Sequence, residues 1–202
     1  MTTDDEEGRW LAEQTASRLR DIQAGHLAWT EIDLIDIGDD TARPLRDGLE
    51  VFGVRVNYVP VCQPRHVVAA LGGGRPVAPY VVIACHGDNG RILMAEVPDA
   101  LAGAQPFHGS IGPGEVRRHL RLSGSVVLTT GCGTGRRDLA DAFLDVGARA
   151  FIAPSGYPEG YAGVFAPLFL FYELTERRSL ADAVRRLSGH DDALAMWQLH
   201  QR

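Results

Sequence analysis

Two short segments constrain the fold of this chain more than any other feature: PYVVIAC at 79–85, which is continuously apolar, and SVVLTT at 125–130, which reads as a second buried strand. Each is short and rich in β-branched residues, which is typical of a strand that is buried on both faces of a sheet. Strands of this kind occur mainly in parallel sheets that are covered by helices on both sides. The two segments therefore predict a central, mostly parallel sheet.

Strand and helix patterns alternate along the rest of the chain. Further strands are expected in EIDLIDIGDD, ending at Gly38, and at 54–61 and 149–155. This alternation predicts an α/β three-layer sandwich with about five sheet strands and helices on both faces. A small β-hairpin turning at Asn89-Gly90 is expected after strand 79–85, followed by a long loop at 97–113. Helices are predicted at 44–53, 114–122 and 136–146, in PRHVVAALGGG, and in the closing segments FAPLFLFYEL and SLADAVRRL.

The length of 202 residues allows one substantial core, and no segment has the composition of a linker, so a single domain over 1–202 is predicted. Residues 31–188 are its expected core. Residues 1–28 carry apolar side chains at helical spacing and are expected to form an N-terminal helical extension.

Composition excludes several functional classes. All 20 basic residues are arginine, which excludes a phosphate-binding lysine loop, a pyridoxal Schiff base and a Ser-Lys dyad, because each needs an ammonium group. The net charge of −6 and the lack of a basic run argue against nucleic acid as a partner. No apolar run is long enough for a membrane span, no secretion signal is recognisable, and three cysteines are too few for a disulfide framework. We therefore expect a reduced, cytoplasmic protein.

The segment LTTGCGTG, which ends at Gly135, can be interpreted in two ways. It resembles the glycine-rich cofactor loop L-D-L-G-C-G-T-G of S-adenosylmethionine-dependent methyltransferases. In that family the loop usually follows the first strand, whereas here about four strands precede it and only 67 residues follow Gly135. The acid that should hold the ribose at the end of the next strand is also missing before Glu159. The methyltransferase is therefore the less favoured alternative.

The second interpretation starts from the thiol of Cys132, which follows strand 125–130 and precedes a predicted helix. The other buried strand, 79–85, is followed by His86 and Gly87. In open α/β sheets, the residues just beyond the carboxyl ends of central strands line the ligand crevice. If the two strands are neighbours, as right-handed crossovers favour, His86 and Cys132 lie side by side.

These residue types have the chemistry of a nucleophile and its base. A nearby imidazole and a helix N-terminus lower the pKa of a thiol, so we expect this effect at Cys132. Gly131 and Gly133 leave room for a substrate carbonyl. The backbone N–H groups of Gly87 and Cys132 are the expected oxyanion hole.

The order of these residues resembles that of the caspase-like cysteine peptidases, which include bacterial caspases and the CHAT domains related to separase. In that family one strand ends in His-Gly and the next core strand ends in the nucleophilic cysteine, as VVIACHGD and VVLTTGCGTG do here. The His86–Cys132 spacing of 46 residues is close to the ~50 of caspases. The resemblance covers roughly residues 31–188, and the closing FYELTERRSLADAVRRL is similar to CHAT domains. It implies a caspase-like fold and a cysteine endopeptidase.

The nucleophile motif also departs from that family. T-G-C-G-T stands where caspases have Q-A-C-[RQG]-G, and Thr130 stands where metacaspases have an aspartate two residues before the cysteine. The resemblance therefore does not carry substrate preference over to this chain.

The substrate pocket should be lined by loops that follow the strands. Three acids, Asp36, Asp39 and Asp40, follow the first strand, where caspases place an arginine that binds an acidic side chain, so a basic P1 residue is predicted instead. The alternative is that the Asp39-Asp40 pair caps the helix that begins near Pro44. The further substrate-binding candidates are Asp88, Thr130, Ser155, Tyr157 and Glu159.

Other cysteine and histidine residues are weaker candidates. Cys85 lies inside a strand next to His86, so its side chain should point to the opposite face and serve packing. His108 is also followed by glycine, but no strand precedes it. Cys62 and His66, with Cys85, do not form a recognisable metal-binding pattern.

We therefore predict a peptide-bond hydrolase in which Cys132 attacks the carbonyl and His86 transfers protons. Its partner is a protein or peptide substrate, and neither a metal nor an organic cofactor is expected. The alternative from another class is a catalytically silent caspase-like module that binds or scaffolds.

Overall fold

The computed structural model describes residues 5–9 and 31–202. Residues 5–9 are helical, and the remainder of the helical extension predicted at 1–28 lies outside the described residues. No helix within the described ranges is both long and apolar enough to cross a membrane.

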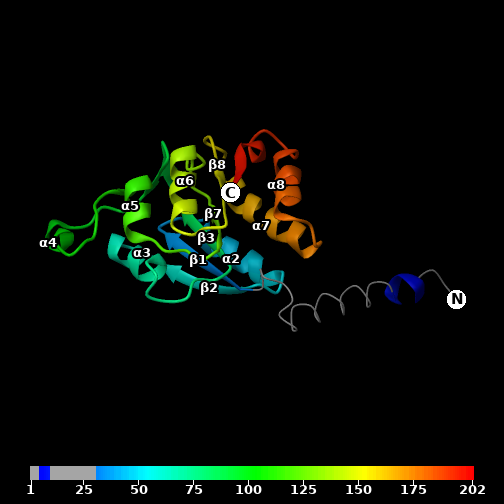
Figure 1. Cartoon of the computed structure of the whole chain (residues 1–202). Coiled ribbons are helices and arrows are strands. Elements are labelled where there is room, and N and C mark those ends of the chain that lie inside the picture. Colours follow the sequence, from blue (N-terminus) through cyan, green and yellow to red (C-terminus); the bar gives the residue numbers. More distant parts are fainter. Residues whose placement is uncertain (1–4, 10–30) are drawn as a thin grey trace.

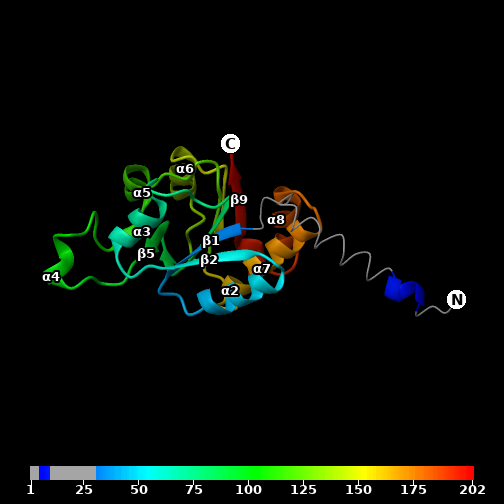
Figure 2. The same cartoon turned by 90° about the horizontal axis from the view of Figure 1, so that it is seen from below.

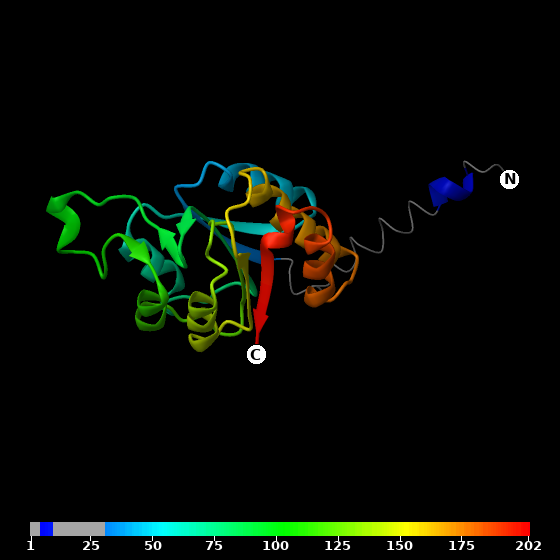
Figure 3. The same ribbon diagram turned by 90° about the horizontal axis from the view of Figure 1, so that it is seen from above.

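The central sheet has six strands, and five of them are parallel (Figure 1). Strands β3 and β7, the two apolar segments of the sequence, lie side by side at its centre, with Ile83 opposite Thr129. The sixth strand, β9, runs antiparallel to β8 at one edge (Figure 3). In spatial order the strands are β2 (Arg55–Pro60), β1 (Glu31–Ile37), β3 (Tyr80–Cys85), β7 (Val126–Thr129), β8 (Ala150–Pro154) and β9 (Trp197–Gln201).

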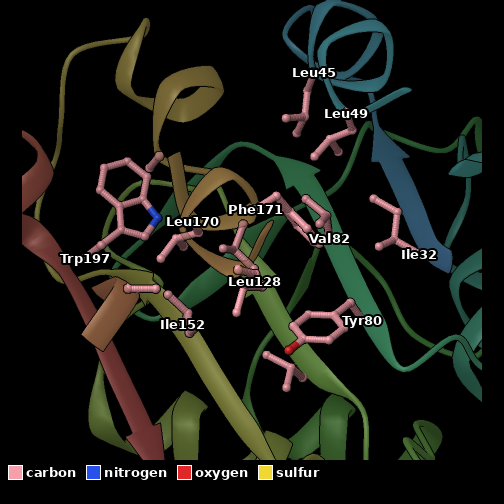
Figure 4. Close-up of a cluster of buried hydrophobic side chains, with 14 of the residues drawn as sticks. Ile32, Leu45, Leu49, Tyr80, Val82, Leu128, Ile152, Leu170, Phe171 and Trp197 are labelled. Atoms are coloured by element: carbon pink, nitrogen blue, oxygen red, sulfur yellow. The ribbon is translucent and has the colours of Figure 1, made fainter. Parts of the chain in front are cut away.

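Helices cover both faces of this sheet, which confirms the predicted α/β sandwich (Figure 2). One face is covered by α2 (Ala42–Val51), α7 (Ala162–Thr175) and α8 (Leu180–Ser188). The other is covered by α3 (Pro64–Leu71), α5 (Pro113–His119) and α6 (Arg137–Asp145). Successive strand residues alternate between two apolar clusters, because strand side chains point to opposite faces. Figure 4 shows the first cluster, in which Val82 and Leu128 meet Leu170 and Phe171 of α7.

A second, small sheet follows β3. Its strands β4 (Gly87–Asp88), β5 (Arg91–Leu93) and β6 (Ser110–Ile111) are antiparallel. The turn at Asn89-Gly90 joins the first two, as predicted, with both residues at positive φ (47° and 76°). Such a turn matches the twist of a hairpin.

The structure differs from the sequence-based expectation in two segments. The predicted loop 97–113 contains a short helix, α4 (Asp99–Ala102), and strand β6. The polar tail, for which no structure was predicted, contains the short 3-10 helix η1 (Leu194–Met196) and strand β9. In β9 the buried Trp197 alternates with the exposed Gln198, so this is an edge strand with one apolar face.

A buried carboxylate, that of Asp33, anchors the amino-terminal part of β1. Asp33 is fully buried, and its Oδ2 lies 3.0 Å from Nη2 of Arg75. The same oxygen accepts the N–H of Ala78 at 3.1 Å, and Oδ1 accepts Nδ2 of Asn57 on β2 at 3.2 Å. One side chain thereby joins β1 to β2 and to the segment leading into β3.

We predict that Asp33→Ala destabilises the fold, because it leaves the buried N–H of Ala78 without an acceptor and removes the partner of Arg75. The free energy of unfolding, measured by urea titration, should fall by about 3 kcal/mol. The matched Asp47→Ala, at an exposed position of α2, should change it by less than about 0.5 kcal/mol. Equal losses in the two variants would contradict this assignment.

Candidate active site

The ends of β3 and β7 bring the two predicted reactive residues to the same edge of the sheet. Beyond the paired strands, the N–H of Thr130 donates to the carbonyl of Ile83 at 3.1 Å. The N–H of Cys85 donates to Oγ1 of Thr130 at 3.0 Å. These two bonds continue the pairing past the last strand residues, so the segments that carry His86 and Cys132 leave the sheet as neighbours.

Gly87 lies directly against the segment that carries the thiol. A Cβ atom at this position would lie 2.6 Å from the carbonyl oxygen of Cys132 and 2.9 Å from the carbonyl carbon of Gly131. Neither distance is compatible with a real side chain. Glycine after His86 is therefore what allows the two strand exits to approach so closely.

The turn that holds Cys132 is fixed by hydrogen bonds from several sides. Gly133, at φ 63°, accepts the N–H of Gly90 at 3.0 Å and donates to the carbonyl of Gly156 at 2.7 Å. The hydroxyl of the fully buried Thr134 lies 2.6 Å from both the Gly131 carbonyl and the Thr129 hydroxyl. The sequence analysis did not select Thr134, although a buried hydroxyl directly after a Gly-Cys-Gly turn is a usable signal.

The pKa of the Cys132 thiol is raised, not lowered as the sequence analysis expected. Partial burial is the largest cause, because it disfavours the thiolate, and the Asp39 carboxylate adds a repulsive charge. Helix α6 begins only at Arg137, so its N-terminus is five positions along the chain from the thiol. The dipole of a helix acts mainly within its first turn. Partial burial and the Asp39 charge therefore both favour the protonated thiol.

His86 is exposed, and within the described residues no hydrogen bond joins its imidazole to the Cys132 sulfur. The neighbouring Cys85 points into the core, as predicted, and burial raises its pKa to about 12. All three cysteines are free, and Cys62 is exposed. Of the three cysteines, Cys132 is the half-buried one and lies where the strands end, whereas Cys85 is a buried packing residue.

The geometry of the hairpin leaves the N–H of Gly87 facing away from β5. The N–H of Leu93 donates to the carbonyl of His86 at 3.0 Å, and Gly87 lies opposite Ile92. In antiparallel pairs, the position next to a hydrogen-bonded pair directs its N–H away from the partner strand. The nitrogen of Gly87 lies 3.1 Å from the position that a Cβ of Gly131 would occupy, so the Gly87 backbone lies beside the thiol turn.

Two further candidates, Asp88 and Tyr157, form a bridge beside this turn. The hydroxyl of Tyr157 lies 2.5 Å from Oδ1 of Asp88, and this hydrogen bond raises the pKa of Tyr157. The same hydroxyl would lie 3.7 Å from a Cβ of Gly133. The bridge links the β4–β5 hairpin to the loop after β8, next to Cys132.

The three acids predicted to follow the first strand have separate environments, and one of them, Asp36, belongs to the strand itself. Asp36 lies on β1 and accepts hydrogen bonds from the hydroxyl of Tyr58 and, at 3.0 Å, from the N–H of Asp39. Asp39 accepts the N–H of Thr41 at 2.8 Å, which supports the start of α2. Its other carboxylate oxygen, Oδ2, lies 3.4 Å from the hydroxyl of Thr130. Thr130 stands two residues before Cys132 in the chain. Asp40 is exposed.

Ser155 and Glu159 lie in the loop after β8. Both the N–H and the hydroxyl of Ser155 donate to the carbonyl of Met196, at 2.8 and 3.1 Å, so this residue secures the start of β9. Glu159 is exposed. His108 is exposed in the loop before β6. Across the described ranges, no three His, Cys, Asp or Glu side chains converge as metal ligands would.

No protein family model matches this chain, and no curated protein does. Solved structures do match. The Arg-specific cysteine proteinase gingipain R superposes with a TM-score of 0.55 at 12% identity, over 86% of this chain and 46% of that chain. The complex of the Porphyromonas gingivalis RgpB pro- and mature domains gives a TM-score of 0.53 at 12% identity, over 84% and 47%. The chain thus spans less than half the length of these neighbours.

This likeness shows that the chain shares its α/β fold with this cysteine proteinase. At such low identity it does not extend to catalytic residues or specificity.

We predict that Gly87→Ala destabilises the protein, because its Cβ must displace the Cys132 carbonyl or the Thr134 methyl group, which it would approach to 2.6 Å. The free energy of unfolding should fall by roughly 1–3 kcal/mol in urea titrations. Gly103→Ala is the matched control, because a Cβ there meets no atom within 4 Å. A Gly87→Ala variant as stable as this control would disprove the close approach.

We predict that Asp39→Asn lowers the pKa of Cys132 and speeds its alkylation at neutral pH. Removing the carboxylate favours the thiolate, whereas the Asn side-chain oxygen can still accept the N–H of Thr41. Iodoacetamide labelling of Cys132, followed by mass spectrometry from pH 6 to 10, should become faster at pH 7, and its pH profile should move toward lower pH. Asp40→Asn makes the same charge change at the neighbouring residue and should leave the profile unchanged.

Proposed function

We propose that this protein is a cysteine-dependent peptide-bond hydrolase with Cys132 as nucleophile and His86 as general base and acid. The observation that supports this most is the contact between Gly87 and the Gly131–Cys132 segment, which puts a histidine and a half-buried thiol at adjacent strand exits. The caspase-like fold supports the same reaction class.

The proposed reaction has two stages. The Cys132 sulfur attacks the substrate carbonyl while His86 takes the thiol proton and then gives it to the leaving amine, which forms an acyl-enzyme. Water, deprotonated by His86, then hydrolyses the thioester and releases the acid and the free thiol. Because the Cys132 pKa is raised, transfer of the thiol proton to His86 is proposed to accompany substrate binding.

The N–H groups of Gly87 and Cys132 are the proposed oxyanion donors. The N–H of Gly87 points away from β5, as the hairpin pairing requires, and its nitrogen lies beside Gly131. The N–H of Cys132 makes no hydrogen bond to a backbone carbonyl within the described residues. Two preorganised amides at this position can stabilise the charge that develops on the carbonyl oxygen.

Asp39 is the proposed determinant of substrate preference, and the preferred P1 residue is basic. Its carboxylate acts on the Cys132 pKa, so it lies within electrostatic reach of a side chain bound beside the thiol. Asp36 is engaged by Tyr58 on β2 and is the weaker candidate. The Asp88–Tyr157 bridge and the exposed Asp40, Ser155 and Glu159 are proposed to line the peptide-binding surface. Thr130 is only 6% exposed and accepts the N–H of Cys85, so it is proposed to support this surface from beneath. A free thiol nucleophile also suits the reduced cytoplasmic location predicted from the sequence.

A catalytically silent caspase-like binding module is the second candidate. Two observations favour the silent module. The pKa of Cys132 is raised, and no hydrogen bond joins His86 to the Cys132 sulfur among the described residues. The free forms of many hydrolases also have long catalytic contacts, so activity has to be measured.

We predict that the purified protein cleaves fluorogenic peptides from a positional library, with preference for Arg or Lys at P1. Cys132→Ala and His86→Ala should each reduce kcat/KM by roughly 10³-fold or more, because nucleophile and base act as a unit. Cys62→Ala and His108→Ala, which replace exposed residues of the same types, should retain activity. If the wild type cleaves no peptide and iodoacetamide labels Cys132 no faster than Cys62, the silent module is the correct assignment.

A further inference from the structure

The residue that follows the candidate nucleophile, Gly133, lies between two loops from different parts of the chain. Its N–H donates to the carbonyl of Gly156 at 2.7 Å, and its carbonyl accepts the N–H of Gly90 at 3.0 Å. A Cβ at Gly133 would lie 3.4 Å from the nitrogen of Asn89 and 3.7 Å from both Cζ and the hydroxyl oxygen of Tyr157. The turn that carries the thiol is therefore in contact with both the β4–β5 hairpin and the loop after β8.

A hydrogen bond joins these two loops directly. The hydroxyl of Tyr157 donates to Oδ1 of Asp88 at 2.5 Å. The second carboxylate oxygen of Asp88 accepts Nδ2 of Asn89 at 3.0 Å. Both oxygens of this carboxylate are thus engaged, so Asp88 is held in the orientation that receives the phenol. The hairpin and the loop, which contact Gly133 separately, are in this way tied to each other beside the thiol turn.

Neither loop is strongly attached to the core. Strand β4 has only two residues, and the register partners of both lie on β5. In the loop after β8, Tyr157 is 60% exposed, and Glu159 and Gly160 are exposed as well. Segments with few buried contacts open at a lower free-energy cost than the core does. The hydrogen bond between the two loops can therefore decide how closely they hold the thiol turn, although it contributes little to global stability.

The phenol of Tyr157 is also close to the thiol. The hydrogen bond to Asp88 is the largest cause that raises the pKa of Tyr157, and Cys132 adds a smaller one, so the phenol and the thiol lie within electrostatic reach of each other. The same hairpin carries Gly87, whose backbone lies directly against the thiol turn. Movement of the hairpin away from the loop after β8 would loosen the contact that brings His86 and Cys132 to adjacent strand exits.

We propose that Tyr157 is a positioning residue, which clamps the hairpin after His86 to the loop after β8 through Asp88 and thereby sets the position and the reactivity of the Cys132 thiol. The clamp holds the turn closed while the hydrogen bond is made and releases it when the bond breaks. This role needs no contact with a substrate. As a role in catalysis the clamp rests on the proposed hydrolase, whereas its effect on the thiol itself does not.

Alkylation of Cys132 by iodoacetamide at a fixed pH, followed by mass spectrometry, tests the clamp. Tyr157→Phe and Asp88→Ala each remove the hydrogen bond, so Cys132 should be labelled about two- to tenfold faster than in the wild type, as expected for the loss of one hydrogen bond. Asp88→Asn keeps an oxygen that accepts from the phenol and should label at close to the wild-type rate. Tyr161→Phe, at a tyrosine that is 62% exposed at the start of α7, is the matched control and should leave the rate unchanged.

Two comparisons separate the clamp from other effects. Equal acceleration in Asp88→Asn and Asp88→Ala would indicate a charge effect and overturn the clamp, as would an unchanged rate in Tyr157→Phe. Because both side chains act through one bond, the Asp88→Ala/Tyr157→Phe double variant should label no faster than either single variant, and multiplied accelerations would also overturn it. The urea midpoint should stay at the wild-type value in every variant, because the replaced side chains are exposed.

Peptide cleavage supplies the catalytic readout. Tyr157→Phe should lower kcat by about two- to tenfold and leave KM unchanged, because a loosened turn exposes the thiol but misaligns it with the bound carbonyl. A raised KM at constant kcat would overturn the positioning role and make Tyr157 a residue that binds substrate. If the wild type cleaves no peptide, the proposed hydrolase fails, whereas the labelling rates still decide whether the clamp exists.

Discussion

The close approach of two backbone segments at the ends of β3 and β7 is the constraint on which the candidate site depends. Parallel pairing with Ile83 opposite Thr129 brings the strand exits together, and the absence of a side chain at Gly87 lets them touch. Hydrogen bonds from Gly90 and to Gly156 then hold the turn around Cys132. The thiol is consequently carried by a rigid turn at a sheet edge, which suits a nucleophile that must meet a substrate in one orientation.

Charge is distributed differently at the two ends of the sheet. At the carboxyl ends of the strands, Asp39 and the Asp88–Tyr157 bridge surround a thiol whose pKa is raised by partial burial. At the opposite end, Arg149, Arg177 and Arg178 line a cavity beside Tyr80, and Arg178 forms an ion pair with the buried Glu173.

Most of the fold could be predicted from the sequence because its strands are strongly marked. Short segments rich in β-branched residues identified β3 and β7, and the Asn89-Gly90 turn was predicted from its residue types. Strand β9 was missed because WQLHQ has only two apolar side chains, and its stability comes from pairing with β8. The expected effect of the helix dipole on Cys132 was wrong, since α6 begins at Arg137 and the intervening residues form a turn.

The sequence by itself determined the order of elements and which residues could react, because periodicity and residue type are local properties of a chain. It determined that a histidine and a cysteine follow two buried strands, and that no lysine is available for catalysis. Only the tertiary structure decided that Asp39 reaches toward the thiol while Asp36 is engaged by Tyr58. It also gathered Arg149 with Arg177 and Arg178 in one cavity. Such proximity between residues distant in the sequence arises only when the strands pair and the helices pack on them.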